Sequence, residues 1–407
     1  MIPLAKIVFW ASFLLALHPY VIYPVLVRLA WSIRRRKPRG LTPHARAEPQ
    51  APAEPPITII VPAHNEERGI ARRIENLLAL DYPRHKTQIL IVSDASTDGT
   101  NGVVAAFAER GLVEFVALPE RRGKTGAQNA ALPRARGDVV VFTDASTLFR
   151  PDALRRILLP LADSAVGCVG GWVVLTTTGD FAGRPRLGPY LRFEQRLRQM
   201  EGEIWTTTGL NGCCYAIRRE LLAPMDERAQ IDDLVNGLRT IAAGRRVVYE
   251  RTAVCAEAIE IESRAGFRRR VRTSLGGLTT LFSMPKLLNP LRRPFVAFQI
   301  FSHRLLRVVL VPLLLVSLLA NLALARTSPL YDLILAAQLL FWLGVAAGSL
   351  IPRPPRALHP WLTRLARPCG VLYAFLQQHL ASTLALWLYL TGSARARPTQ
   401  WEPFPRQ

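Results

Sequence analysis

The feature that most constrains this chain is a soluble-looking segment held between long apolar stretches. Residues 7–31 are mostly apolar and aromatic, and three further stretches follow near the other end, at about 305–325, 330–351 and 370–391. A run of about 20 apolar residues is the length that a membrane-spanning helix needs. We therefore expect a globular domain between an N-terminal transmembrane anchor, residues 1–33, and C-terminal transmembrane helices.

Basic residues are in excess and gather beside the apolar stretches. Lys and Arg outnumber Asp and Glu by 52 to 30, which gives a formal net charge of +22. Clusters at 34–37, 268–272 and 353–367 suit an anionic membrane surface and phosphate-bearing ligands. Nucleic acid is the rival partner, but the clusters are not interleaved with aromatic residues, so we expect no nucleic acid binding.

The order of the first apolar stretch and its basic cluster indicates orientation. A secretory signal peptide has its basic residues first, whereas here the cluster 34–37 comes last. Cytosolic loops carry the excess of Lys and Arg, so we expect a retained anchor whose C-terminal side is cytosolic. Arginines at 353–367 and at 395–406 put both the last loop and the tail in the cytosol. One intervening span does not allow both, so we expect the loop to be cytosolic, and the side of the tail stays open.

Between the apolar stretches, short apolar runs alternate with segments of helical spacing such as 67–80. The strand-like runs are 57–61, 89–93, 113–118, 139–143, 166–174 and 246–249. Regular alternation of this kind implies an α/β fold with a mainly parallel sheet and right-handed crossovers. We expect this domain over residues 57–258, after a linker at 34–56.

The basic and apolar residues of 259–304 have the composition of amphipathic helices that lie in the plane of a membrane interface. Residues 305–391 then hold the predicted C-terminal transmembrane helices, and 392–407 form a tail.

Two of the strand-like runs end in a carboxylate. Asp94 follows 89–93, and Asp144 follows 139–143. Open α/β sheets bind ligands at the carboxyl ends of their strands, so the pattern is typical of a nucleotide-using enzyme. A turn residue at a strand end is the alternative for each aspartate.

Four motifs in succession resemble those of family 2 glycosyltransferases of the membrane-associated, cellulose-synthase-like type. They are VPAHNE at 61–66, SDASTDGT at 93–100, GKTGAQN at 123–129 and FTDAS at 142–146. The resemblance covers about residues 57–282, and the order of the motifs makes it specific. It implies a GT-A (nucleotide-diphospho-sugar transferase) fold and a nucleotide sugar as donor.

The resemblance also implies which residues bind the donor. Asp94 matches the aspartate that accepts a hydrogen bond from the base, with Glu66 near the ribose and base. Lys124 and Arg272 match basic residues near the diphosphate. A P-loop ending at Lys124 fails because Leu118 stands where that motif needs a glycine. A solvated basic turn is the alternative for Lys124.

Asp144 matches the first aspartate of the family's D-x-D signature, which holds Mg²⁺ or Mn²⁺ against the diphosphate. Ser146 stands where the second carboxylate is usual. A hydroxyl oxygen is a weaker ligand than a carboxylate for a hard divalent cation. We expect Mg²⁺ or Mn²⁺ as cofactor, at Asp144 and Ser146.

Asp233 matches the general base of the family's T-E-D segment. The reaction needs such a base, because the acceptor hydroxyl must lose its proton as it attacks. Asp232 would lie beside it, and the small-residue patch with Gly209, Asn211 and Gly212 would line the acceptor side, where backbone approaches a sugar closely. Acids that complement a helix N-terminus are the alternative for Asp232 and Asp233.

These matches predict an inverting glycosyltransferase of the bacterial inner membrane, multi-pass, with a cytosolic catalytic domain. It would move a sugar, from a UDP-sugar by preference, to a saccharide or lipid-linked acceptor in polysaccharide or glycolipid biosynthesis. Polymer extension and single transfer both stay open, because Thr273 replaces the family's acceptor-stacking tryptophan. The alternative is a catalytically impaired membrane subunit that binds a nucleotide sugar or a partner synthase.

Overall fold

The structure, a computed structural model, comprises two units. The sheet unit is built from Val27–Ile261, and the helical unit combines Met1–Leu26 with Glu262–Arg397. Most of the predicted linker and the predicted tail after residue 392 lie outside the described residues. The described residues are 2–36, 54–183, 188–227, 229–258, 264–350 and 360–392.

The sheet unit is organised around a sheet of eight strands. In chain order they are β1 (Ile57–Ala63), β2 (Thr87–Ser93), β3 (Glu114–Ala117), β4 (Val139–Thr143), β5 (Leu148–Phe149), β6 (Val166–Thr176), β7 (Cys214–Arg218) and β8 (Arg246–Ala258). Their order across the sheet is β3-β2-β1-β4-β7-β6-β8-β5. The neighbouring pairs among β1 to β4 are parallel, as are β6 and β8, whereas β7 and β5 run antiparallel to their neighbours. The predicted mainly parallel α/β sheet is therefore confirmed.

Two strands differ from the prediction. β7 was not predicted, since the patch of small residues expected at 209–214 ends where the strand begins, and Cys214–Arg218 lacks the run of Val and Ile that marks β1 and β4. β8 continues to Ala258 instead of ending at Tyr249. Its pairing with β6 shifts register between Gly171 and Trp172. The polar residues of β8 at this irregularity break the apolar pattern, so the sequence did not reveal that the strand continues.

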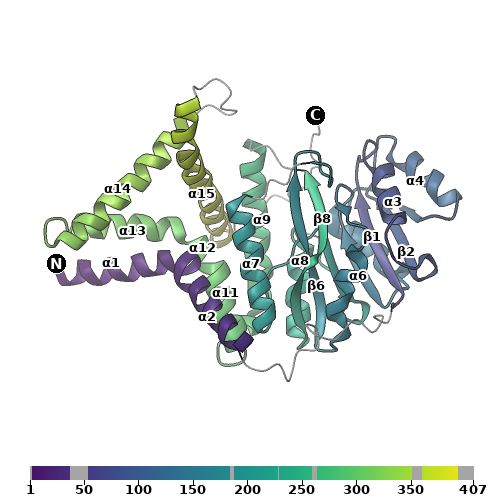
Figure 1. The fold of residues 1–407 in the computed structure, drawn as a ribbon, viewed down its shortest axis with the longest axis horizontal. Coiled ribbons are helices and arrows are strands. Elements are labelled where there is room, and N and C mark those ends of the chain that lie inside the picture. Colours follow the sequence, from purple (N-terminus) through teal and green to yellow (C-terminus); the bar gives the residue numbers. More distant parts are fainter. Residues whose placement is uncertain are drawn as a thin grey trace. The chain divides into compact units, whose positions relative to one another are not determined.

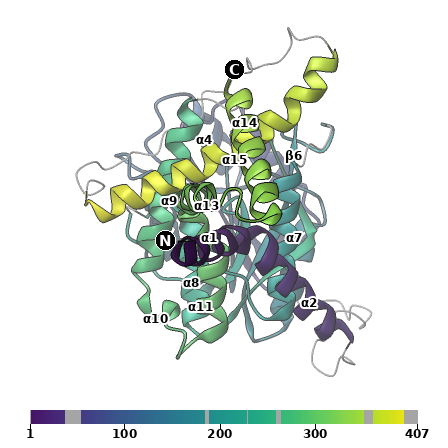
Figure 2. The same cartoon turned by 90° about the vertical axis from the view of Figure 1, so that its left-hand side faces the viewer.

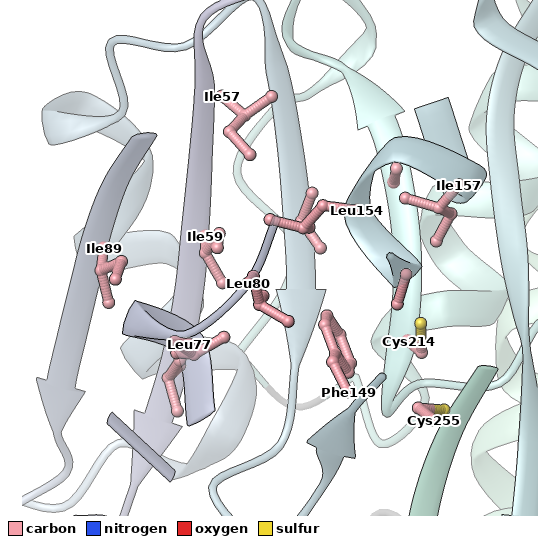
Figure 3. Packing of buried hydrophobic residues seen from close by; sticks show 14 of the residues in the cluster. Ile57, Ile59, Leu77, Leu80, Ile89, Phe149, Leu154, Ile157, Cys214 and Cys255 are labelled. Carbon is pink, nitrogen blue, oxygen red and sulfur yellow. The ribbon is translucent and has the colours of Figure 1, made fainter. Parts of the chain in front are cut away.

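Helices cover the sheet, as Figure 1 shows for α3, α4 and α6. Leu77, Leu154 and Ile157 from these helices pack against Ile57 and Ile89 of the strands in one buried cluster (Figure 3). Fully burying a side chain of this size contributes about 1.5–3 kcal/mol. The helices of the unit are α3 (Ile70–Leu78), η3 (Arg84–Lys86), α4 (Thr100–Glu109), α5 (Gly123–Ala131), η4 (Leu132–Arg134), α6 (Ala153–Leu158), η5 (Leu159–Ala162), α7 (Pro189–Ile204), η6 (Arg219–Leu221) and α8 (Asp232–Ala242).

The helical unit contains α1 (Ile2–Leu17), η1 (His18–Ile22), the start of α2 (Tyr23–Arg36), α9 (Arg264–Phe282), α10 (Pro285–Leu288), α11 (Pro294–Ile300), η7 (Phe301–Leu305), α12 (Leu306–Val308), α13 (Leu310–Leu322), α14 (Pro329–Leu350) and α15 (Pro360–Leu390). Helices α1 and α13 lie side by side (Figure 2). Phe9 packs with Ala320 and Leu324. Trp10 Nε1 donates to the Tyr331 hydroxyl at 3.2 Å, which ties α1 to α14 as well.

Among the described residues, two helical segments are long and apolar enough to cross a membrane, Ile2–Arg35 and Pro329–Leu350. The first extends beyond the predicted end of the anchor at residue 33. The end of α15, expected as a span at 370–391, is not among them, because Gln377, Gln378 and His379 make it more polar.

The stretch expected as one span at 305–325 is bent by 70° between Val308 and Leu310, and among the described residues this bent pair of helices is apolar enough to form a third, broken span or a re-entrant loop. Pro312 explains the bend, since proline has no N–H to donate to the carbonyl of Val308 four residues earlier. Thr383 Oγ1 of α15 donates to that carbonyl at 2.8 Å in its place.

Gly137 offers a test of the packing between the start of β4 and β1. A Cβ at Gly137 would lie 2.4 Å from the backbone carbon of Ile57 and 2.4 Å from the Thr58 nitrogen. We expect Gly137→Ala to destabilise the sheet unit by about 1–3 kcal/mol, because backbone atoms must shift.

The matched control is Gly102→Ala in α4, where a Cβ would meet nothing within 4 Å. Alanine is the better helix former, so this change should stabilise the unit by up to about 1 kcal/mol. Thermal unfolding of the full chain in detergent measures both. Equal melting temperatures for the two variants would contradict the packing described.

Candidate active site

Loops from several strands meet at one edge of the sheet. Because β1, β2 and β4 are parallel, the residues that follow them, including Asp94 and Asp144, lie at their common C-terminal edge. β7 runs the other way and begins at Cys214, which pairs with Thr143 at the end of β4. The segment 209–212 before β7 therefore reaches the same edge.

Lys124 lies at the centre of the charged groups on this edge. Its Nζ is 2.7 Å from Asp144 Oδ1 and 3.2 Å from Asp232 Oδ1. Burial lowers the pKa of the Lys124 ammonium, but attraction to Asp144 and then Asp232 outweighs this effect and leaves the pKa above its ordinary value. Lys124 is therefore a fixed positive charge that joins α5 to the end of β4 and the start of α8.

Asp232 is buried, and protein groups contact both its oxygens. Besides the ion pair of Oδ1 with Lys124, Oδ2 accepts from Gln128 Nε2 at 2.9 Å and from the Tyr215 hydroxyl at 3.1 Å. The Tyr215 hydroxyl in turn accepts from Asn236 Nδ2 at 2.9 Å. The residue predicted to lie on the acceptor side thus belongs to a buried network that holds Lys124.

Gly212 leaves space between Lys124 and Asp233. A Cβ at Gly212 would lie 3.4 Å from Lys124 Nζ and 3.6 Å from Asp233 Oδ1. Asp233 is half-buried in the first turn of α8. The structure thus brings the predicted general base, the predicted diphosphate lysine and one predicted acceptor-side glycine together.

Asn211 and Gly209 precede Gly212 on the same segment. Asn211 Oδ1 accepts from Arg198 Nη1 of α7 at 3.0 Å, and Arg198 also donates to the Leu210 carbonyl at 3.2 Å. Within the described part of the chain, Asn211 Nδ2 is buried and has no hydrogen-bond partner. The backbone N–H of Gly209 donates to Thr207 Oγ1 at 3.4 Å. Arginine contacts from α7 therefore fix the shape of this segment.

Asp94 and Glu66 lie on neighbouring loops after β2 and β1. Asp94 is 1% exposed, and its two oxygens accept from the backbone N–H groups of Arg122 at 2.7 Å and Gly123 at 2.9 Å. Glu66 is half-buried, and its backbone N–H donates to Thr100 Oγ1 at 2.8 Å. Their predicted contacts with base and ribose stay predictions.

Ser146 is exposed on the loop after β4, and the next residue of that loop, Thr147, contacts a carboxylate that the sequence analysis missed. Glu257 Oε1 of β8 accepts from Thr147 Oγ1 at 2.9 Å. Burial raises the pKa of Glu257, and the negative charge of Asp144 adds to this rise. The prediction overlooked Glu257 because it ended the last strand at residue 249.

Arg73 is a second missed residue. It is fully buried, and its Nη2 donates to Thr143 Oγ1, directly before Asp144, at 2.7 Å. Burial lowers the pKa of Arg73 to about 10, so the side chain keeps its positive charge at neutral pH. The helical phase of Ile70, Ile74 and Leu77 places Arg73 on the buried face of α3, and that phase is the sequence signal that could have found it.

Arg272 lies on α9 of the helical unit, so its predicted contact with the diphosphate stays a prediction.

Residues 58–224 match the profile of Glycosyl transferase family 2. The probable glycosyltransferase YdaM of Bacillus subtilis is 24% identical over 61% of each chain. The poly-beta-1,6-N-acetyl-D-glucosamine synthase of Staphylococcus aureus is 24% identical over 54% of each, and an N-acetylglucosaminyltransferase of Rhizobium meliloti is 26% identical over 72% of each. The chain thus spans less than two thirds of the first two of these relatives.

A solved structure shares the fold. The mannosyltransferase PcManGT from Pyrobaculum calidifontis, in complex with GDP-Man and Mn²⁺, has a TM-score of 0.64 at 23% identity and covers 92% of this chain and 99% of its own. The predicted GT-A fold is confirmed by this likeness. The chain is thus similar to Glycosyl transferase family 2 over residues 58–224, and it shares the GT-A fold.

Proposed function

We propose that the chain is an inverting glycosyltransferase that moves a sugar from a nucleotide sugar to a saccharide or lipid-linked acceptor at the bacterial inner membrane. The observation that carries this proposal is the meeting of Lys124, Asp144, Asp232 and Asp233 at one edge of the sheet. The sheet unit would face the cytosol, where nucleotide sugars are made. The candidate membrane spans and the basic clusters support this location.

The donor diphosphate would lie against Lys124. An ammonium group in a partly buried site neutralises phosphate charge more effectively than one in water. Glu66 and Asp94 are the proposed residues on the nucleoside side, and Arg272 is proposed as a second cation. Two of the relatives are named for N-acetylglucosamine, which makes UDP-N-acetylglucosamine the first donor to test, and the complex of PcManGT makes GDP-mannose the second.

A divalent cation fits the chemistry of the residues present, with the protein supplying few of its ligands. Asp144 carries a carboxylate that is one-third exposed, and Ser146 adds an exposed hydroxyl, both oxygen ligands of the kind that Mg²⁺ and Mn²⁺ prefer. No group of three His, Cys, Asp or Glu side chains within the described ranges could hold a metal. When bound, the ion would offset charge on the departing diphosphate.

The transfer itself would need a group that takes a proton, and a positive charge beside the leaving diphosphate. Asp233 would take the proton of the acceptor hydroxyl as it attacks the anomeric carbon from the side opposite the diphosphate. Lys124 would neutralise the charge that develops on the leaving diphosphate. Gly212, next to both groups, would leave room for the acceptor.

The proposal is tested with the purified full chain in lipid vesicles, using labelled UDP-N-acetylglucosamine, other UDP-sugars and GDP-mannose. We expect label from one donor to enter a lipid or saccharide product. Addition of EDTA should abolish the transfer, and excess Mn²⁺ or Mg²⁺ should restore it. Binding of a nucleotide sugar without transfer to any acceptor would instead support a non-catalytic membrane subunit.

Asp233→Asn isolates the proposed base. The amide cannot take a proton, so we expect the turnover rate to fall by about a hundredfold to ten-thousandfold, while the affinity for the nucleoside diphosphate stays within about twofold. Asp152→Asn, at the start of α6 and paired with Arg156, is the control and should keep full activity. Transfer at a normal rate by Asp233→Asn would rule out this residue as the base.

Gly212→Ala tests the space beside Lys124 and Asp233. The added Cβ makes ordinary contacts of 3.4 Å and 3.6 Å, so the melting temperature should hardly change. The methyl group would displace an acceptor that approaches there, and we expect kcat/KM to fall about tenfold to a hundredfold. Gly102→Ala is the control. Unchanged kinetics in Gly212→Ala would place the acceptor elsewhere.

A further inference from the structure

We propose that Arg73, together with Asn76, positions the loop 144–147, which carries the proposed cation ligands Asp144 and Ser146. Both side chains lie on α3 and hold the two ends of this loop, so they are positioning residues and not ligands. The inference rests on the proposed function, because it concerns how the divalent cation of that function is held.

Arg73 holds the start of the loop. Its Nη2 donates to Thr143 Oγ1 at 2.7 Å, and Thr143 is the last residue of β4, directly before Asp144. Arg73 and Thr143 are both 0% exposed. A hydrogen bond from a charged donor is stronger than one between neutral groups, and in the interior water does not compete for it. The end of β4 is therefore fixed by a charged group on α3.

Asn76 holds the other end of the loop, at Phe149 of β5. Its Nδ2 donates to the Phe149 carbonyl at 2.9 Å, and its Oδ1 accepts from the Phe149 N–H at 2.9 Å. Strand β5 lies at the edge of the sheet, where backbone groups lack a neighbouring strand. The amide of Asn76 takes the place of that strand and fixes the backbone of Phe149.

Arg73 and Asn76 also contact each other, so the two ends of the loop are held by one connected group. Arg73 Nη1 donates to Asn76 Oδ1 at 2.7 Å, and the guanidinium carbon of Arg73 lies 4.5 Å from the centroid of the Phe149 ring. Between the ends, Thr147 donates to Glu257 of β8. The loop is thus held at three points.

Packing alone does not account for a buried arginine at this position. Burial lowers the pKa of Arg73 to about 10, which shows that the charge is costly to bury. An apolar side chain on the same face of α3 as Ile70, Ile74 and Leu77 would pack without this cost. A guanidinium offers what such a side chain lacks, several donors in a rigid plane that reach both Thr143 and its neighbour on the helix.

Charge and position have opposite effects on a cation at Asp144, and this makes the role testable. The positive charge of Arg73 repels a divalent cation, so removal of the charge alone should tighten cation binding. Loss of the contact with Thr143 should weaken binding, because groups that orient the ligands of a metal typically contribute about tenfold to a hundredfold in affinity. The sign of the change in Arg73→Met therefore separates a positioning residue from a buried charge without this role.

The test measures binding of Mn²⁺ alone to the purified full chain in detergent, from the loss of the electron paramagnetic resonance signal of the free ion. We expect the affinity to fall about tenfold to a hundredfold in Arg73→Met. Asn76→Leu changes no charge and releases the other end of the loop, so it should also weaken binding. Unchanged or tighter binding of Mn²⁺ in either variant would overturn the proposal.

Gln195→Met is the matched control for the loss of a side-chain amide. Gln195 of α7 is 0% exposed, and its amide bonds both backbone groups of Val173 in β6, at 3.2 Å and 2.9 Å. Val173 and Phe149 pair with the same residue of β8, Cys255, from opposite sides. The control should bind Mn²⁺ as wild type does. A loss as large as that of Asn76→Leu would mean that any such amide affects the site, and the proposal would fail.

Hydrogen exchange of the metal-free proteins gives a second readout. In Asn76→Leu the N–H of Phe149 loses its acceptor and should exchange faster, and in Arg73→Met the amides of 145–149 should do the same. Residues 103–109 of α4 should match wild type in both variants. Equal exchange over 145–149 in all three proteins, or faster exchange throughout α4 as well, would contradict a local positioning role.

The outcomes separate this inference from the proposed function. If Arg73→Met binds Mn²⁺ as tightly as wild type, the inference fails while sugar transfer by wild type still supports a glycosyltransferase. If wild type binds no Mn²⁺, the inference fails too, and transfer of sugar again decides the function on its own. If wild type transfers no sugar but Mn²⁺ binds and weakens in both variants, the proposed function fails and the role of Arg73 stands.

Discussion

The site depends on one lysine ammonium held between two carboxylates. Taking a charge out of water is costly unless an opposite charge is close, so Lys124, Asp144 and Asp232 can be partly buried only together. Their contacts of 2.7 Å and 3.2 Å join three elements that are distant in the sequence, α5, the end of β4 and the start of α8. The hydrogen bonds of Gln128 and Tyr215 to Asp232 fix the geometry of this arrangement.

The sheet explains why these residues meet. Parallel strands place the ends of β1, β2 and β4 at one edge, and the antiparallel β7 brings the glycine-containing segment before Cys214 back to that edge. Buried groups behind the edge complete it, with Arg73 under the end of β4 and Asp94 under the start of α5. Function in such a fold resides in the loops, while the strands set their positions.

Much of this could be predicted from the sequence, and the omissions have physical causes. The strands β1, β2 and β4 contain runs rich in Val and Ile, so their ends, and with them Asp94 and Asp144, were predictable from pattern alone. β7 is as buried as β4 but lacks such a run, and the irregularity in β8 concealed Glu257. No local pattern could indicate that the backbone of Arg122 and Gly123 would engage Asp94, because that contact depends on how the chain returns to the sheet after β3.

The most direct test of the account is a double-mutant cycle between Lys124→Met and Asp232→Asn, measured as the free energy of unfolding of the full chain in detergent. Lys124→Met leaves Asp232 without its counter-charge, and Asp232→Asn removes one of the two carboxylates that hold Lys124, whereas the double change removes both charges of the pair. The account predicts a coupling free energy of about 1–3 kcal/mol, with the double variant no less stable than the worse single variant. Additive effects within about 0.5 kcal/mol would show that the two residues do not depend on each other, and would contradict the central role of this ion pair.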